Sequence, residues 1–128
     1  MVLIDTSAWI HALRPDGDKD IREKVRHCVA EGIASTTDIV VLELLKGATS
    51  DKDYSNLKES LSALDSLEIT KEVWERAFNL SHDLRKKGVS IPATDLLISA
   101  VALHYNCALL HNDKHFSLVA KKSGLREL

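Results

Sequence analysis

Four acidic residues stand in or directly beside apolar stretches of this 128-residue sequence. Asp5 follows the run Val-Leu-Ile, and Glu43 lies inside IVVLELLKGA. Asp95 lies in IPATDLLISAVAL, and Asp113 comes shortly after ALLH. Burying a carboxylate is costly unless the group gains a partner. These positions are therefore candidates for a site that needs negative charge.

Carboxylates gathered in one crevice would repel one another and raise each other's pKa values. A hard divalent cation removes that conflict, and Mg²⁺ prefers oxygen ligands while keeping several of its waters. Such an ion can activate water and stabilise negative charge on a phosphate. These residue types therefore favour metal-dependent hydrolysis of a phosphate ester, with Asp5 as a ligand of the ion.

Two of the four acids also have ordinary structural explanations. Asp95 falls in the first turn of a helix that Pro92 would open, where an acid interacts favourably with the helix dipole. Glu43 lies close to one helical turn from Lys46, and an ion pair between them would account for its position. From the residues alone, both explanations stay open.

Short apolar runs alternate with helical patterns along the chain. Strands are expected at Met1–Asp5, Ile33–Ser35, Leu67–Ile69, Ala108–Leu110 and, weakly, Leu125–Leu128. Helices are expected at Ala8–Leu13, Ile21–Glu31, Ile39–Leu45, Leu57–Leu64, Lys71–Lys87, Ala93–Tyr105 and Phe116–Lys121. The alternation predicts an α/β fold with a parallel sheet covered by helices on both faces. The apolar stripe of the fifth helix is expected to contain Val73, Trp74, Ala77, Phe78 and Leu84.

This fold class would bring two of the acids together. Ligands of open parallel sheets bind beyond the carboxyl ends of the strands. Asp5 lies at that end of the first strand, and Asp113 lies just beyond that end of Ala108–His111. If these two strands are neighbours, both carboxylates face one crevice.

The composition predicts one globular domain spanning residues 1–128, because 45% of the residues are hydrophobic and 28% are charged. No apolar stretch approaches the ~20 residues of a membrane helix, and no signal-peptide pattern is present, so we expect a cytoplasmic protein. Cys28 and Cys107 are expected to be buried free thiols. The net charge of −2 gives no global signal for nucleic acid, so a polyanion would need a local basic patch or a bound cation.

Four motifs, in this order, resemble the PIN domain, and the small VapC-type ribonuclease toxins in particular. They are VLIDTSAW, LELLKGA, IPATDLLISAVAL and LLHNDKHF. The resemblance covers essentially the whole chain and implies a three-layer α/β/α sandwich around a short parallel sheet. It also implies an endonuclease that cleaves single-stranded regions of RNA and depends on Mg²⁺ or Mn²⁺. A homodimer and a small VapB-like antitoxin that blocks the site are further implications.

By the same resemblance, the acidic site consists of Asp5, Glu43, Asp95 and Asp113, with a hydroxyl of Thr6 or Ser7 beside the metal. We expect Asp5, Asp95 and Asp113 to bind the ion directly or through water. Glu43 is expected to position or deprotonate the attacking water.

The last motif departs from the family, whose usual T-x-D-x-D-F reads H-N-D-K-H-F here. His111 replaces the threonine and His115 replaces the second aspartate, which leaves four acids in place of five. We therefore expect one firmly held ion and a second that is weaker and depends on substrate. The histidines either assist protonation or phosphate contact, or are ordinary loop residues. Phosphate contacts are expected from Arg14, Lys46 and Lys114.

Other functions fit the sequence less well. Ser7 occupies the second acidic position of the D-x-D found in phosphatases with an aspartate nucleophile. The stretch PDGDKD lacks the glycine and the bidentate acid of a calcium loop, and neither a G-x-S-x-G elbow nor a phosphate-binding loop is present. A PIN-like module that binds RNA or protein without cutting, and an RNA-processing nuclease that is not a toxin, stay open as alternatives.

Overall fold

The apolar runs that lead to Asp5 and Asp113 are neighbouring central strands of a parallel sheet. In the computed structural model, which describes residues 1–128, five strands follow the order β3-β2-β1-β4-β5. They are β1 (Val2–Ile4), β2 (Ala34–Thr36), β3 (Asp65–Ser66), β4 (Ala108–Leu110) and β5 (Arg126–Glu127). Every pairing is parallel, and Leu3 lies opposite both Ser35 and Leu109. The carboxyl ends of all five strands therefore point to the same edge of the sheet.

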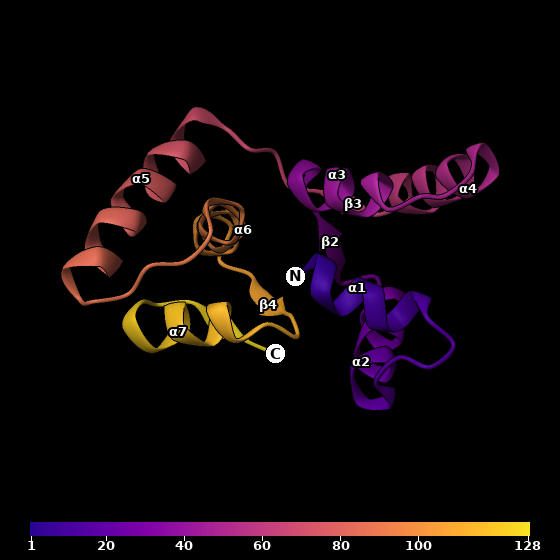
Figure 1. Cartoon of the computed structure of the whole chain (residues 1–128), viewed down its shortest axis with the longest axis horizontal. Helices are drawn as coiled ribbons and strands as arrows, with labels where there is room; N and C mark the ends of the chain where they lie inside the picture. Colours follow the sequence, from indigo (N-terminus) through magenta and orange to yellow (C-terminus); the bar gives the residue numbers. More distant parts are fainter.

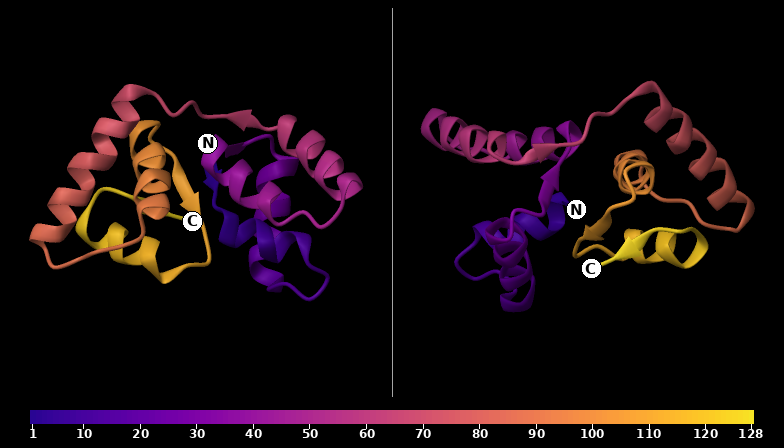
Figure 2. Two further views of the ribbon diagram at one scale, coloured as in Figure 1. Left: turned by 45° about the horizontal axis from the view of Figure 1, so that its top comes forward. Right: turned by 180° about the vertical axis from the view of Figure 1, so that it is seen from behind.

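Seven helices connect and cover the strands. They are α1 (Thr6–Leu13), α2 (Lys19–Ala30), α3 (Asp38–Lys46), α4 (Asp51–Ser62), α5 (Lys71–Lys86), α6 (Ala93–His104) and α7 (Lys114–Lys122). Figure 1 shows α5, α6 and α7 together on one side of the central strands and α1 and α2 on the opposite side, and Figure 2 shows the same grouping from two further directions. This arrangement confirms the predicted α/β class with a helix-covered parallel sheet. None of the helices combines the length and the apolar character needed to cross a membrane.

Helix α6 lies within the core. Its residues 97–102 are all buried, as expected for a helix that is apolar on every side and is covered by other elements. The adjoining helix α5 buries Val73, Ala77, Leu80 and Leu84. Cys28 and Cys107 are buried free thiols, as predicted.

Two residues of the stripe predicted for α5 lie outside the core. Trp74 and Phe78 are 46% and 58% exposed. Each follows a buried residue directly, Val73 and Ala77, and one residue along a helix turns the side chain by about 100°. The prediction was wrong at these two positions because α5 packs on the core through a narrow apolar face, and both residues lie beside that face.

The third strand begins and ends earlier than predicted. Strand β3 is Asp65–Ser66 and not Leu67–Ile69. Leu67 follows the strand, donates its N–H to Thr36 O at 2.8 Å and buries its side chain. The paired residues of β3 are exposed, because an edge strand joins the sheet through its backbone and needs no apolar side chains.

The loop between α1 and α2 lies close against the end of α1. A Cβ at Gly17 would stand 1.9 Å from His11 O, so only glycine fits this position. His11 Nδ1 accepts the N–H of Asp18 at 2.9 Å, and His11 Nε2 lies 2.8 Å from the side-chain amide of Asn112. His11 of α1 therefore contacts both this loop and the segment that follows β4.

Candidate active site

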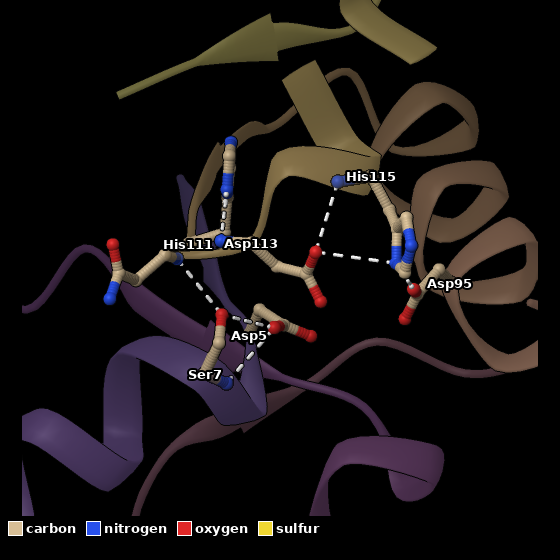
Figure 3. Close-up of polar contacts among 7 residues, drawn as sticks. Asp5, Ser7, Asp95, His111, Asp113 and His115 are labelled. Carbon is tan, nitrogen blue, oxygen red and sulfur yellow. Dashed lines mark hydrogen bonds and ion pairs between the residues drawn. The ribbon is translucent and has the colours of Figure 1, made fainter. Parts of the chain in front are cut away.

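Two of the predicted acids begin helices at the carboxyl edge of the sheet (Figure 3). Asp5 directly follows β1 and is the N-cap residue of α1, and Asp113 follows β4 and is the N-cap residue of α7. Aspartate is favoured at this position because its carboxylate accepts an N–H of the first turn. Asp5 N donates to Leu110 O at 2.9 Å, which holds the two strand ends side by side. Helix capping and strand pairing together bring both carboxylates to one edge.

Asp5 is almost fully buried, with 4% of its surface exposed. Its Oδ2 accepts two hydrogen bonds, one from Ser7 N at 2.9 Å and one from Ser7 Oγ at 2.6 Å. Ser7 Oγ in turn accepts the N–H of Asn112 at 2.9 Å. Burial raises the pKa of Asp5 above its usual 3.8, and the bonds from Ser7 oppose that rise. Ser7 thus fixes Asp5 and ties it to the loop after β4.

Glu43 reaches the same crevice from α3. Thr6 Oγ1 donates to Glu43 Oε1 at 2.8 Å, across 37 residues of sequence. Burial raises the pKa of Glu43, and the negative charges of Asp5 and Asp95 raise it further. The ion-pair explanation is wrong, because the direct partner of Glu43 is Thr6 and Lys46 acts on it only through its more distant charge.

Asp95 and Asp113 lie on either side of His115. His115 Nδ1 is 3.0 Å from Asp95 Oδ2 and 3.3 Å from Asp113 Oδ1. The backbone N–H of His115 also donates to Asp113 Oδ1 at 2.9 Å. Burial raises the pKa of Asp95, the bond from His115 lowers it, and the charges of Asp113 and Asp5 raise it again. Figure 3 shows the Asp113 carboxylate directed toward His115, with Asp5 on its other side.

The four acids predicted from the sequence therefore converge on one crevice. Thr6, the residue after Asp5, donates to Glu43, and Ser7 joins Asp5 to Asn112, the residue before Asp113. His115 in turn lies between Asp113 and Asp95. The negative charges of neighbouring acids also raise the pKa of Glu43 and of Asp95, as expected for carboxylates that lie close together. The alternative explanation of Asp95 as an acid that only meets a helix dipole does not account for its contact with His115.

His111 points away from these acids toward the end of the sheet. Its Nδ1 accepts the N–H of Asp113 at 3.1 Å, so its Nε2 carries the hydrogen donated to Glu127 Oε1 at 2.8 Å. Glu127 also accepts a bond from Ser117 Oγ, and these partners hold the pKa of Glu127 below its usual value. Both ring nitrogens of His111 are used within the fold, which fits a positioning role for the loop that carries Asp113.

A groove of about 690 Å³ opens beside Glu43, between α1, α3 and α4. Thr6, Glu43 and Arg14 line it together with apolar residues such as Ile10 and Leu13. Of the three cations predicted to contact phosphate, Arg14 is thus the one beside this opening. Lys46 and Lys114 are exposed and do not line the groove.

The residues of the crevice fit a divalent cation. Ligand atoms of Asp95, Asp113 and His115 lie within 4.8 Å of one another. No lysine or arginine forms an ion pair with these acids, and their side-chain partner is the His115 imidazole. With Asp5 and Glu43 nearby, the crevice carries more negative charge than the protein itself neutralises, which an ion would offset.

The sequence predicted Thr6 and Ser7 beside the metal or substrate and only a minor role for His115. In the structure both hydroxyls donate to acids of the site, Thr6 to Glu43 and Ser7 to Asp5, and their contact with a metal or substrate stays a prediction. His115 lies two residues after a helix-capping aspartate, and this spacing is the signal that could have placed its side chain beside Asp113. The contact with Asp95 depends on the packing of α6 against α7 and has no local signal.

The chain matches the family model of the PIN domain over residues 2–122. It is similar to Ribonuclease VapC51 of Mycobacterium tuberculosis, with 31% identity over 125 residues that cover 95% of this chain and 87% of the relative. It is 28% identical to Ribonuclease VapC11 of the same species over 130 residues, covering 98% of this chain and 96% of the relative. The solved structure of VapBC2 from Rickettsia felis, bound to a DNA fragment from its promoter, has the same fold. Its TM-score is 0.80 at 22% identity, over 100% of this chain and 98% of that chain.

Proposed function

Since the chain belongs to the PIN-domain family, and within it to the VapC ribonucleases, we propose that it is an endoribonuclease that hydrolyses phosphodiester bonds in single-stranded regions of RNA. The reaction would depend on Mg²⁺, which Mn²⁺ can replace. The observation that carries this proposal is the set of contacts through which Asp5, Glu43, Asp95 and Asp113, from four separate segments, converge on one crevice. Burying that much negative charge destabilises the free protein, so the arrangement is best explained by a catalytic requirement.

Asp95 and Asp113 would hold the ion with Asp5, directly or through water. When bound, the ion lowers the pKa of water and stabilises negative charge on the phosphate. Ser7 keeps Asp5 in one orientation through two hydrogen bonds, and Asn112 in turn fixes Ser7. The fold thereby positions the Asp5 carboxylate before any ligand arrives.

Glu43 is the residue suited to accept a proton from the attacking water. Its Oε1 is occupied by Thr6, whereas its Oε2 accepts no hydrogen bond within the protein. Burial and the neighbouring acids raise its pKa, which makes the ionised carboxylate a stronger base near neutral pH. Thr6 acts by holding Glu43 in this orientation, and Arg14 is placed to contact a phosphate in the adjoining groove.

We further propose that the chain is a toxin neutralised by a small VapB-like antitoxin. Support comes from the relatives named VapC ribonucleases and from VapBC2, a complex that was solved on promoter DNA. A homodimer stays a prediction, which light scattering on the purified chain would test.

The experiment that tests the activity compares RNA from cells that briefly express the chain with RNA from cells that express Asp5→Asn. We expect new cleavage ends with the unchanged chain and none with the variant, and purified chain should cleave RNA with Mg²⁺ or Mn²⁺ but not with EDTA. Cleavage that persists in Asp5→Asn would overturn the proposal. Co-purification with a small DNA-binding protein, and growth arrest that this protein relieves, would favour a toxin over an RNA-processing nuclease.

A further inference from the structure

His115 places a nitrogen donor among the oxygen donors of the crevice, directly between Asp95 and Asp113. We propose that His115 Nδ1 is a direct ligand and that the site prefers a divalent first-row transition-metal ion, represented by Mn²⁺, over Mg²⁺. This inference rests on the proposed metal-dependent function and concerns which class of ion the crevice takes.

The spacing of the three donor atoms suits a shared ion. Ligands at right angles on bonds of about 2.1 Å lie about 3 Å apart. His115 Nδ1 lies 3.0 Å from Asp95 Oδ2 and 3.3 Å from Asp113 Oδ1, so both separations agree with neighbouring positions around one ion. The structure already holds these atoms close together, so only small movements would be needed to bind the ion.

The chemistry of the donors determines which ion is favoured. Mg²⁺ takes oxygen ligands almost exclusively, whereas imidazole is a good ligand for transition-metal ions, whose affinity for nitrogen donors exceeds that of Mg²⁺. Asp5 Oδ2 and Glu43 Oε1 each accept a hydroxyl hydrogen bond, from Ser7 and from Thr6, whereas the Asp95 and Asp113 oxygens are contacted by His115 alone. The group of three atoms around His115 is therefore where an entering ion meets several donors at once.

His115 is accessible and well oriented for this role. It lies in the first turn of α7, where its backbone N–H is fixed to Asp113, and its side chain is 33% exposed. Nδ1 lies within hydrogen-bond distance of Asp95, so it carries the hydrogen of that contact. An ion that binds Nδ1 takes the place of this hydrogen, which a neutral ring transfers to Nε2 by way of water and a ring with both hydrogens releases as a proton.

The competing explanation is that His115 only supplies positive charge to the two acids. In that case His115 would weaken the binding of every cation to the same extent, and replacing it with an acid would strengthen the binding of Mg²⁺ and of Mn²⁺ equally. A direct ligand predicts a different outcome, because only the nitrogen distinguishes between the two ions. The ratio of the two affinities therefore separates the explanations.

The test measures the binding of Mn²⁺ and Mg²⁺ to the purified chain by calorimetry, with His115→Asp as the variant. His82→Asp, an exposed position on α5, makes the same change of charge as a control. We expect the unchanged chain to prefer Mn²⁺, and His115→Asp to reduce that preference by at least about tenfold, as changes beside a bound metal commonly do. The control should keep the preference.

Pulsed electron paramagnetic resonance of bound Mn²⁺ gives a second, independent measurement. The nitrogen modulation of a coordinated imidazole should be present in the unchanged chain and in His82→Asp, and absent from His115→Asp and His115→Gln. Absence of the modulation from the unchanged chain would overturn the inference, as would an unchanged Mn²⁺ to Mg²⁺ ratio in a folded His115 variant. Circular dichroism identifies which variants are folded.

Cleavage assays keep this inference separate from the proposed function. RNA cleavage with either ion, without a nitrogen signal, would leave the ribonuclease standing and remove His115 as a ligand. A nitrogen signal in a chain that cleaves RNA with neither ion would keep the selective metal site and remove the ribonuclease.

Discussion

The two sides of the crevice hold their acids differently. On the β1 side, Asp5 is fixed by hydrogen bonds from α1, the helix that it caps. On the side of α6 and α7, the Asp95 carboxylate accepts a hydrogen bond from His115 alone. Asp5 is 4% exposed, and both of its side-chain hydrogen bonds come from Ser7, the second residue of α1. The side chains of Asp113 and His115 are each about one-third exposed and depend on one another. Asp5 and Asp113 are therefore both oriented by the helices that they cap, whereas Asp95 and the His115 ring are positioned by a contact that an ion can rearrange.

This difference has a simple physical origin. A capping aspartate is oriented by the backbone, which is rigid once the helix has formed. The Asp95 carboxylate and the His115 ring meet between two helices and are oriented by each other and by the charges around them. The β1 side thus supplies a fixed and buried carboxylate, and the α6–α7 side supplies a capping carboxylate together with two ligands that can adapt to the ion.

Replacing the fixed acid should have the largest effect of all. Asp5→Asn removes the negative charge but keeps a residue that caps helices well, so we expect RNA cleavage to fall by at least about a hundredfold while the fold persists. Cleavage rates and thermal unfolding measure the two effects. Asp18→Asn is the matched control, since Asp18 caps α2 in the same way by accepting Ile21 N. If both variants lose cleavage equally, helix capping and not charge at the crevice explains the loss.

A bound ion should stabilise the protein mainly through the adaptable side. At an ion concentration of about 100 times Kd, binding adds about 2.7 kcal/mol to the free energy of unfolding. We expect Mn²⁺ to raise the melting temperature of the unchanged chain and to have little effect on a variant with both Asp95→Asn and Asp113→Asn. Thermal unfolding with and without the ion measures this shift. A full shift in the double variant would mean that the ion binds elsewhere.

Loss of the hydroxyl that fixes Asp5 should cost stability with or without an ion. Ser7→Ala removes one of the two hydrogen bonds to Asp5 Oδ2 and leaves the Asn112 N–H without a partner, so we expect a loss of roughly 1–3 kcal/mol in the free energy of unfolding. Urea unfolding measures it. Ser62→Ala is the control, because that exposed hydroxyl only donates to Glu59 O in its own helix. Equal losses in the two variants would contradict a special role for Ser7.

The buried charge of Asp5 should also make stability depend on pH in a defined direction. Because the pKa of Asp5 is raised above 3.8, the folded protein binds more protons than the unfolded chain just above that pH. The free energy of unfolding should therefore fall as the pH rises through this window, and the cost is fully present above it. Asp5→Asn lacks this cost, so its stability relative to the unchanged chain should increase with pH. Urea unfolding in EDTA between about pH 4 and pH 7 covers the window, and a difference that shrinks with rising pH would contradict the expectation.

Local patterns predicted most of the fold. The strand Ala108–Leu110 has the predicted bounds, and helix α5 ends within one residue of its prediction. Helices α1 and α7 each begin two residues earlier than expected, at Thr6 and Lys114, because Asp5 and Asp113 cap them. Those two acids were predicted to serve the chemistry of the site, and the structure shows that they also cap helices.

The convergence of the acids could also be anticipated, but their partners could not. The position of Asp5 and Asp113 at the ends of two strands follows from the alternation of strands and helices. The partner of Glu43 is Thr6, which the helical spacing of Lys46 did not suggest, because the two elements meet only through tertiary packing. The same holds for Asp95 and His115, which lie 20 residues apart on different helices.

The close approach of Gly17 to His11 means that the crevice can be disturbed from a loop that lies outside it. A substitution of Gly17 would force this loop away from α1, since a Cβ at this position would stand 1.9 Å from His11 O. That movement would separate His11 from Asp18 and weaken its contact with Asn112, the residue that fixes Ser7. In a genetic selection for cells that survive expression of this chain, substitutions of a single loop glycine should therefore be recovered alongside substitutions of the acids.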